Sequence, residues 1–391
     1  MNALYRAMEE ELALLREKGR YRFLRDLETP QGVEIVVDGK RYLNFSSNDY
    51  LGLASSGFLT GAAGELAKRW GVGAGASRLI CGNMEVHREL EVEMARFKGT
   101  EECLVFSTGY MANLGIVSTL GTPETTVFSD ELNHASIIDG CRMSRAKVLV
   151  YRHRDVDHLE DLLKKDENPR KVIITDGVFS MDGDIAPLPE LCELKEKYGA
   201  FLVVDDAHAT GVIGTGGRGT ASHFGVTERV DIHMGTFSKA LGTCGAYICT
   251  SRLVRDYFVN RCRPFIFNTG LPPLIAALTL VSLRHLMKHP DLPSRLREKV
   301  HLFSSVMGEE GYPLSSETPI LPVIVGGDRE TVAVSRRLME EGFFVYGVRP
   351  PTVPEGTGRL RVTVTAAHEE EQIISCARTI ARVMRSVRET T

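Results

Sequence analysis

The fold is decided by an apolar run that ends in ionisable residues: Phe201-Leu202-Val203-Val204, followed by Asp205-Asp206-Ala207-His208. Four consecutive apolar residues predict a strand that is buried on both faces, as in parallel sheets covered by helices. Similar runs on either side alternate with helical segments, so the sequence predicts an α/β fold with a mostly parallel sheet. The predicted strands are 103–106, 126–128, 147–151, 171–175, 201–204, 232–234 and 245–249, and the predicted helices lie near 110–120, 155–165 and 187–198.

The two ends of the chain have a different pattern. Residues 2–18 predict an amphipathic helix, and 33–37 with 42–45 predict a hairpin that turns at Asp38-Gly39. One face of this helix carries Leu4, Met8, Leu12 and Leu15. Near the C-terminus the pattern predicts strands at 321–325, 343–348 and 360–364 and helices near 330–341 and 369–387. We therefore expect an N-terminal arm at 1–45, a large domain at 46–285 and a small α+β domain at 286–391.

The composition excludes several classes of protein. The 391 residues include 47 Lys+Arg and 51 Asp+Glu, a net charge of −4, whereas nucleic-acid-binding proteins usually carry a basic surplus. No secretory signal pattern opens the chain, and the longest apolar stretch, Leu271–Leu283, contains two prolines and is too short to span a bilayer. Eight scattered cysteines without a C-x-x-C pair favour free thiols. We expect a cytoplasmic protein that binds neither nucleic acid nor membrane.

Polar clusters follow several of the predicted strands, where open α/β sheets bind their ligands. Ser107-Thr108-Gly109-Tyr110 opens a helix, so it suits either a phosphate or an ordinary helix cap. Asp205, Asp206 and His208 follow a buried strand and suit either a charged ligand or a structural ion pair. No metal-binding pattern accompanies them, and we expect no metal.

Two further clusters carry a lysine and a histidine. Lys239 ends Thr236-Phe237-Ser238-Lys239 and has small or apolar neighbours. Burial lowers the pKa of a lysine, so such an amine is a candidate to bond an aldehyde, although a lone lysine more often reaches the surface. His134, in Asn133-His134-Ala135-Ser136, suits either stacking on an aromatic ligand or capping of a helix.

One motif is misleading. Gly71-Val72-Gly73-Ala74-Gly75-Ala76 fits the G-x-G-x-x-A fingerprint of dinucleotide-binding proteins. Residues 62–70 have a helical pattern, however, and no βαβ unit surrounds the motif. We interpret it as a glycine-rich loop in which the backbone approaches another group closely.

Together the clusters offer four groups that one cofactor needs. They are a lysine for an aldehyde, a carboxylate for a pyridine nitrogen, an imidazole for an aromatic ring and a helix N-terminus for a phosphate. Pyridoxal 5′-phosphate (PLP) requires this combination, and it is the predicted cofactor.

From about residue 20 onward the chain resembles the α-oxoamine synthases, which are fold-type I PLP-dependent transferases that condense an amino acid with an acyl thioester. The matching stretches are Ser47-Asn48-Asp49-Tyr50-Leu51-Gly52, Gly73-Ala74-Gly75-Ala76-Ser77-Arg78-Leu79, Thr175-Asp176-Gly177-Val178-Phe179-Ser180-Met181-Asp182-Gly183, Asp205-Asp206-Ala207-His208 and Thr236-Phe237-Ser238-Lys239. The resemblance implies a homodimer with shared active sites.

The resemblance also implies a role for each matching residue. Lys239 bonds the cofactor and removes the α-proton, Asp205 pairs with the pyridinium nitrogen, and His134 stacks on the ring and touches substrate. Ser180 and the catalytic His208 reach the phenolic oxygen, while Gly109, Tyr110 and Thr236 hold the phosphate. Thr269 reaches the phosphate of a second subunit. Asn48 and Arg361 bind the amino acid carboxylate, and Arg22 and Thr352 contact the acyl substrate.

The segment Arg349–Arg361 resembles one branch of the family most closely. That branch condenses L-alanine with a pimeloyl thioester, carried by coenzyme A or by acyl carrier protein, in biotin biosynthesis. A branch that uses glycine and acetyl-CoA is the alternative. The implied activity is therefore that of an acyltransferase.

Overall fold

The computed structural model describes residues 2–388. Residues 1 and 389–391, which the predicted domain boundaries include, lie outside the described residues. The chain divides into two compact units. The large unit comprises Asp49–Ser180 and Asp184–Ser294, and the small unit comprises the described parts of Met1–Asn48, Met181–Gly183 and Arg295–Thr391. The N-terminal segment thus shares a unit with the C-terminal segment.

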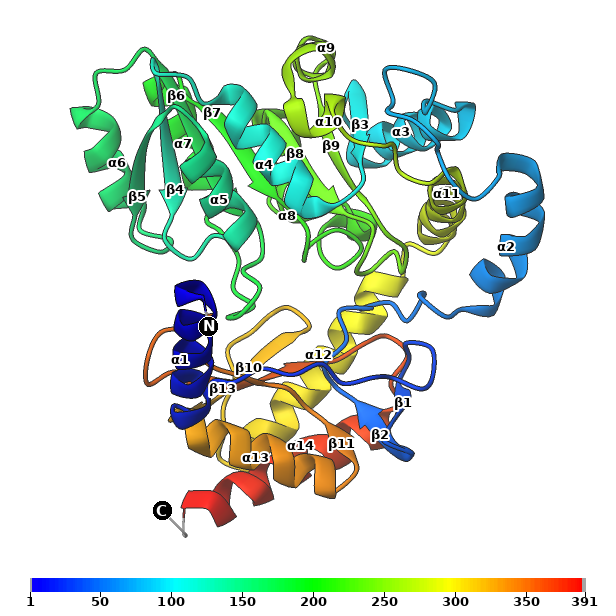
Figure 1. Ribbon diagram of the computed structural model, residues 1–391, viewed down its shortest axis with the longest axis vertical. Helices are drawn as coiled ribbons and strands as arrows, with labels where there is room; N and C mark the ends of the chain where they lie inside the picture. Colours follow the sequence, from blue (N-terminus) through cyan, green and yellow to red (C-terminus); the bar gives the residue numbers. More distant parts are fainter. Residues whose placement is uncertain (1, 389–391) are drawn as a thin grey trace. The chain divides into compact units, whose positions relative to one another are not determined.

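A seven-stranded sheet forms the centre of the large unit (Figure 1). β9 is antiparallel to both of its neighbours, and the other adjacent pairs are parallel. The predicted mostly parallel sheet is therefore confirmed. In spatial order its strands are β3 (Glu102–Phe106), β9 (Ala246–Thr250), β8 (Ile232–Thr236), β7 (Phe201–Asp205), β6 (Arg170–Asp176), β4 (Thr125–Asp130) and β5 (Lys147–Tyr151).

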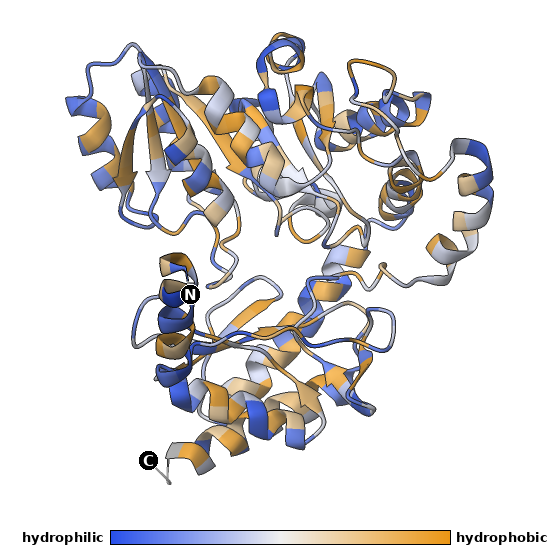
Figure 2. Ribbon diagram, viewed as in Figure 1, coloured by the Kyte–Doolittle hydropathy of each residue, from blue (hydrophilic) through white to orange (hydrophobic). Residues whose placement is uncertain are grey.

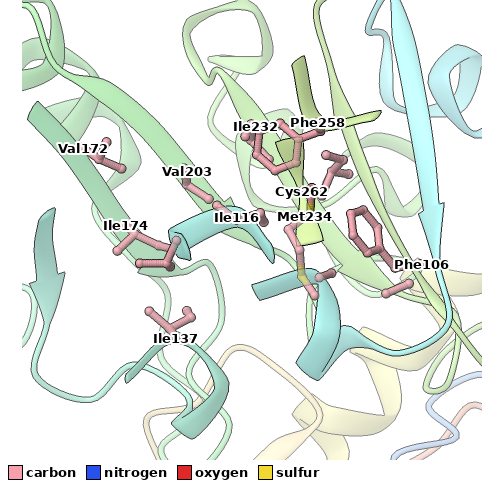
Figure 3. Close-up of a cluster of buried hydrophobic side chains, with 14 of the residues drawn as sticks. Phe106, Ile116, Ile137, Val172, Ile174, Val203, Ile232, Met234, Phe258 and Cys262 are labelled. Atoms are coloured by element: carbon pink, nitrogen blue, oxygen red, sulfur yellow. The ribbon is translucent and has the colours of Figure 1, made fainter. Parts of the chain in front are cut away.

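Both faces of this sheet are buried, which explains the uninterrupted apolar runs. Val203 packs into one cluster with Ile174 and Ile116, as Figure 3 shows, whereas Leu202 and Val204 pack into the cluster on the other face. The first cluster includes side chains of α4 (Gly109–Leu120), α5 (Ala135–Met143), α9 (Arg252–Arg261) and α10 (Arg263–Ile266). The second includes side chains of α6 (Val156–Lys165), α7 (Leu188–Tyr198) and α8 (Thr220–His223). Hydrophobic colours run along these strands in Figure 2.

The remaining helices of the large unit precede and follow this sheet in the sequence. They are α2 (Gly57–Trp70), α3 (Glu85–Lys98) and α11 (Pro273–Lys288), and α11 packs against the other two. The glycine-rich stretch 71–76 comes directly after α2, and Gly71 and Gly75 have positive φ angles. It is therefore a loop after a helix, as predicted, and not a turn after a strand.

The small unit has two three-stranded sheets. The hairpin β1 (Glu34–Val37) and β2 (Lys40–Asn44) gains β11 (Phe343–Phe344) as a parallel third strand. β13 (Gly358–Thr363) pairs with β10 (Ile320–Gly326) and with β12 (Gly347–Val348). The prediction of one strand over 343–348 is wrong, because the chain leaves the first sheet after Phe344 and joins the second at Gly347. The helices here are α1 (Ala3–Glu17), α13 (Asp328–Glu340), α14 (Glu370–Arg388) and most of α12 (Leu292–Glu309).

Most of the apolar face of α1 is exposed among the described residues, and Leu15 is half-buried. No residue of α1 is buried, and Leu4, Met8 and Leu12 are exposed. Between residues 2 and 388, no helix has both the length and the apolar character that a membrane span requires.

Candidate active site

The carboxyl ends of five strands in the large unit meet at one cavity. It is lined by residues at or just after the ends of β3, β4, β6, β7 and β8, which lie at the same edge of the sheet because these strands run in the same direction. Eight predicted site residues are among the lining residues: Gly109, Tyr110, His134, Ser180, Asp205, His208, Thr236 and Lys239. The sequence reasoning did not single out Asn113, Ser136 and Asp176, which also line it.

Asp205 is fixed in the cavity by two hydrogen-bond donors. The backbone N–H of Ala207 donates to Oδ1 at 2.8 Å, and the side-chain amide of Asn113 donates to Oδ2 at 2.7 Å. Asn113 lies in the middle of α4 and also donates to the Ser136 hydroxyl at 2.9 Å. The carboxylate is thereby held in one orientation at the end of β7, where it can face a positively charged ring nitrogen.

Asp206 has a different environment from Asp205. Its side chain and that of Lys98 are both fully buried, and the Lys98 Nζ lies 2.7 Å from Asp206 Oδ2. The backbone N–H of Thr220 also donates to Asp206, at 3.2 Å. The sequence suggests either a charged ligand or a structural ion pair for these acids. Asp205 lines the cavity and is placed to face a ligand, whereas Asp206 forms a structural ion pair.

The Lys98–Asp206 pair gives a stability prediction. Lys98→Met leaves a buried carboxylate without its cation, so the free energy of unfolding should fall by about 3–5 kcal/mol. Urea denaturation of the purified variant measures this change. The double variant Lys98→Met, Asp206→Asn should recover part of the loss. A Lys98→Met protein as stable as the wild type would contradict the account.

His134 has the helix-capping role that is one of the two suggested by its sequence. It is the N-cap of α5, where its Nδ1 accepts from the backbone N–H of Ser136 at 3.2 Å, and its ring also lines the cavity. Its own backbone N–H donates to Asp176 at 2.8 Å. Burial lowers the pKa of His134; the charge of Asp205 opposes this shift and that of Lys239 adds to it. Burial and the adjacent Asp205 raise the pKa of Asp176 well above its usual value. A neutral imidazole ring suits stacking on a flat cofactor.

His208 is positioned by Tyr50. The Tyr50 hydroxyl lies 2.6 Å from His208 Nδ1, and Tyr50 is completely buried. The turn that carries Tyr50 is held by Asp49, whose carboxylate accepts the backbone N–H groups of Leu53 and Ala54. The sequence does not predict this role for Tyr50, because a tyrosine in a loop has no chemical signal of its own.

The phosphate end of the predicted cofactor has a matching place. Thr108 caps α4 through its hydroxyl, which accepts from the Met111 N–H at 3.2 Å, so the helix N-terminus lies at the cavity. A Cβ on Gly109 would lie 2.5 Å from the Thr236 methyl group, which accounts for glycine there. Thr236 Oγ1 is buried and has no partner among residues 2–388, so it is an available donor for a phosphate oxygen. These residues fit the predicted cofactor.

The other predicted residues lie outside this cavity. In the small unit, Arg361 donates to Asn48 Oδ1 at 3.0 Å, and Arg22 donates to the Thr352 hydroxyl at 3.0 Å. The structure thus brings together both residues of each predicted substrate-binding pair. Thr269 belongs to the large unit, where it forms an antiparallel bridge with Ser77.

Nearly the whole chain is similar in sequence and in fold to several known proteins. The family model for aminotransferase class I and II matches residues 40–380. The chain is 48% identical to the 8-amino-7-oxononanoate synthase of Geobacter sulfurreducens, over 97% of this chain and 98% of that protein. A solved structure of SPT with PLP has 32% identity and a TM-score of 0.93 over 99% of both chains. The 8-amino-7-oxononanoate synthase of Francisella tularensis has 29% identity and a TM-score of 0.77, over 88% of this chain and 98% of that one.

Proposed function

The chain belongs to the class I and II aminotransferase family, and from that premise we propose that it is an 8-amino-7-oxononanoate synthase of biotin biosynthesis. It would condense L-alanine with a pimeloyl thioester and release carbon dioxide and a thiol. The observation that carries this proposal is the cavity in which Lys239, Asp205 and the N-terminus of α4 meet. The relatives of that name, similar over nearly the full length, supply the substrates.

Bound PLP supplies an electron sink that stabilises negative charge on the α-carbon of an amino acid. Lys239 would hold the cofactor's aldehyde carbon, Asp205 its ring nitrogen and His134 the face of its ring. Ser180 and His208 would contact the phenolic oxygen, and Gly109, Tyr110 and Thr236 the phosphate. Each of these residues lines the same cavity.

The side chains of this protein would transfer the proton, stabilise charge and bind the two substrates. Once the amino group of alanine has displaced Lys239 from the aldehyde carbon, the freed Lys239 amine would take the α-proton of alanine, and the Asp205 carboxylate would stabilise the positive charge of the ring nitrogen. Asn48 and Arg361 bind the carboxylate of the amino acid, and Arg22 with Thr352 contacts the acyl chain. The new bond joins the α-carbon of alanine to the thioester carbonyl carbon as the thiol leaves, and the resulting β-keto acid loses carbon dioxide.

The two arginines of β13 give a test of carboxylate binding. Arg361 lies 3.0 Å from Asn48, whereas the buried Arg359 forms an ion pair with Asp182. Arg361→Met should raise the KM for alanine roughly tenfold to a hundredfold, as expected for a lost charge-assisted hydrogen bond. Arg359→Met should affect stability more than the KM for alanine. Steady-state kinetics of both variants checks this, and a larger alanine defect in Arg359→Met would reverse the assignment.

We also propose that the protein is a homodimer in which Thr269 reaches the site of the second subunit. The segments around the Ser77–Thr269 bridge carry several exposed apolar side chains, which a second subunit would cover. Val72, Ile80 and Phe267 are each at least 70% exposed. Sedimentation analysis at micromolar concentration should give twice the mass of the 43.2 kDa chain. A single monomeric species would contradict the shared site.

The choice of amino acid tests the proposed function. The purified protein, loaded with PLP, should turn over L-alanine with pimeloyl-CoA or pimeloyl carrier protein and should use glycine with acetyl-CoA at least a hundredfold less efficiently. The opposite preference would place the chain in the glycine-using branch. The two pimeloyl donors, compared in the same assay, decide whether the thioester comes from coenzyme A or from an acyl carrier protein.

A further inference from the structure

His153, which the proposed mechanism does not use, lies between two carboxylates of the large unit. Its Nδ1 lies 2.9 Å from Asp130 Oδ1, and its Nε2 lies 2.7 Å from Asp184 Oδ2. The side chain of Asp130 is 1% exposed and that of His153 is 20% exposed. An ionised carboxylate can only accept hydrogen bonds, so both ring nitrogens donate only when the imidazole is protonated.

The two carboxylates belong to loops that carry cofactor-binding residues. Asp130 ends β4, four residues before His134, and it also accepts the backbone N–H groups of Leu132 and Arg154. Asp184 belongs to a hairpin that is closed by the Val178–Ile185 bridge and by the Phe179 N–H, which donates to the Asp184 carbonyl at 3.0 Å. Ser180, which lines the cavity, lies within this hairpin.

We propose that His153 is a positioning residue: as an imidazolium it bridges Asp130 and Asp184 and thereby holds the loops of His134 and Ser180 in their cofactor-binding arrangement. This inference rests on the proposed function, because it assigns those two loops to PLP. The ring of His153 also packs edge-on against Phe179, with centroids 4.4 Å apart, so the contact with the hairpin includes packing as well as charge.

The charged groups around His153 predict how pH acts on this bridge. Asp130 and Asp184 face the ring, Glu131 accepts the backbone N–H of His153 at 2.8 Å, and the Arg154 guanidinium lies 3.1 Å from Asp184. Burial opposes the charge, but the two carboxylates outweigh it and raise the pKa of His153 to about 9. Because this pKa is raised from its ordinary 6.5, the stability that the bridge contributes is fully present below pH 6.5 and is lost as the pH rises through about 9, where the folded imidazolium loses its proton.

Cofactor affinity tests the proposal without relying on turnover. Equilibrium dialysis with PLP at pH 7.5 should show that His153→Gln raises the dissociation constant about tenfold or more, as expected when charge-assisted hydrogen bonds are lost. His158→Gln is the matched control, because His158 lies five residues away and its Nδ1 accepts from the Arg152 N–H. It should bind PLP within about twofold of the wild type.

A pH series separates positioning from simple structural support. In the wild type, PLP affinity should fall as the pH rises through about 9. Asp184→Asn removes one of the two charges that raise this pKa, so the midpoint should move lower by about one pH unit. This comparison also tests the positioning role of His153 if the His153→Gln variant does not fold.

The outcomes are distinct. Equal PLP affinity of His153→Gln and the wild type, or an unchanged midpoint in Asp184→Asn, overturns the assignment of His153 and leaves the proposed function standing. A wild-type protein that binds no PLP at any pH overturns the proposed function itself.

Discussion

Replacing Lys239 with alanine is expected to abolish turnover. In the proposed mechanism the same amine bonds the cofactor and takes the α-proton, so both tasks are lost together. Proton transfer by a positioned side chain alone accelerates a reaction by about 10²–10⁴-fold. Loss of Lys239 should therefore lower kcat by more than this factor, to below detection in an ordinary assay. Lys239 lines the cavity after β8, close in sequence to Thr236. Steady-state turnover of the PLP-loaded variant measures the effect.

Chemical labelling identifies the lysine that bonds the cofactor. Borohydride reduction of the wild type should fix PLP to Lys239, and peptide mapping should find the label there. Lys195→Ala is a suitable control, since Lys195 forms an ion pair with Asp231 and does not line the cavity. It should keep normal turnover and normal labelling. Label on any other lysine would remove Lys239 from its proposed role.

Asp205→Asn is expected to lower kcat about a thousandfold while the protein still folds and still binds PLP. Asparagine has nearly the same shape and can keep the hydrogen bond from the Ala207 N–H, but it cannot hold a proton on the ring nitrogen. The cofactor then accepts electrons poorly. A loss of about 4 kcal/mol in transition-state stabilisation corresponds to this factor. Cofactor content and kcat, measured on the same preparation, separate binding from catalysis.

Asp206→Asn is the matched comparison because it makes the same chemical change one residue away. Asp206 pairs with the buried Lys98 and does not line the cavity, so its loss should reduce stability and leave the kcat of folded protein within a few fold of normal. The opposite result, with normal kcat in Asp205→Asn and a collapse in Asp206→Asn, would mean that Asp206 is the partner of the ring nitrogen.

The strand ends could be predicted from the sequence because two signals coincide there. A doubly buried strand is a continuous apolar run, and polar residues directly after it are conspicuous. This combination predicts Asp205 directly after its strand and His134 and Lys239 several residues after theirs, and the structure places all three at one cavity. The strands of the large sheet are predicted for the same reason, and their bounds differ from the observed ones by at most two residues.

Functional residues within helices, by contrast, are not marked by an apolar run that ends in polar residues. Asn113 lies in the middle of α4, where a polar residue usually faces solvent, and only the fold brings it to Asp205. The separate environments of Asp205 and Asp206 depend on Lys98, which is more than 100 residues away in the sequence. The division of 343–348 between two sheets was missed because both halves are apolar and nothing between them signals a break.

The central claim is that this chain joins L-alanine to a pimeloyl thioester with loss of the amino acid's carboxyl carbon. The most direct measurement is mass spectrometry of the product formed from two forms of L-alanine, one labelled with ¹³C in the carboxyl group and one in the methyl group. We predict 8-amino-7-oxononanoate that is unlabelled in the first case and carries one ¹³C atom in the second. Retention of the carboxyl label, or product from glycine and acetyl-CoA but none from alanine, would contradict the account.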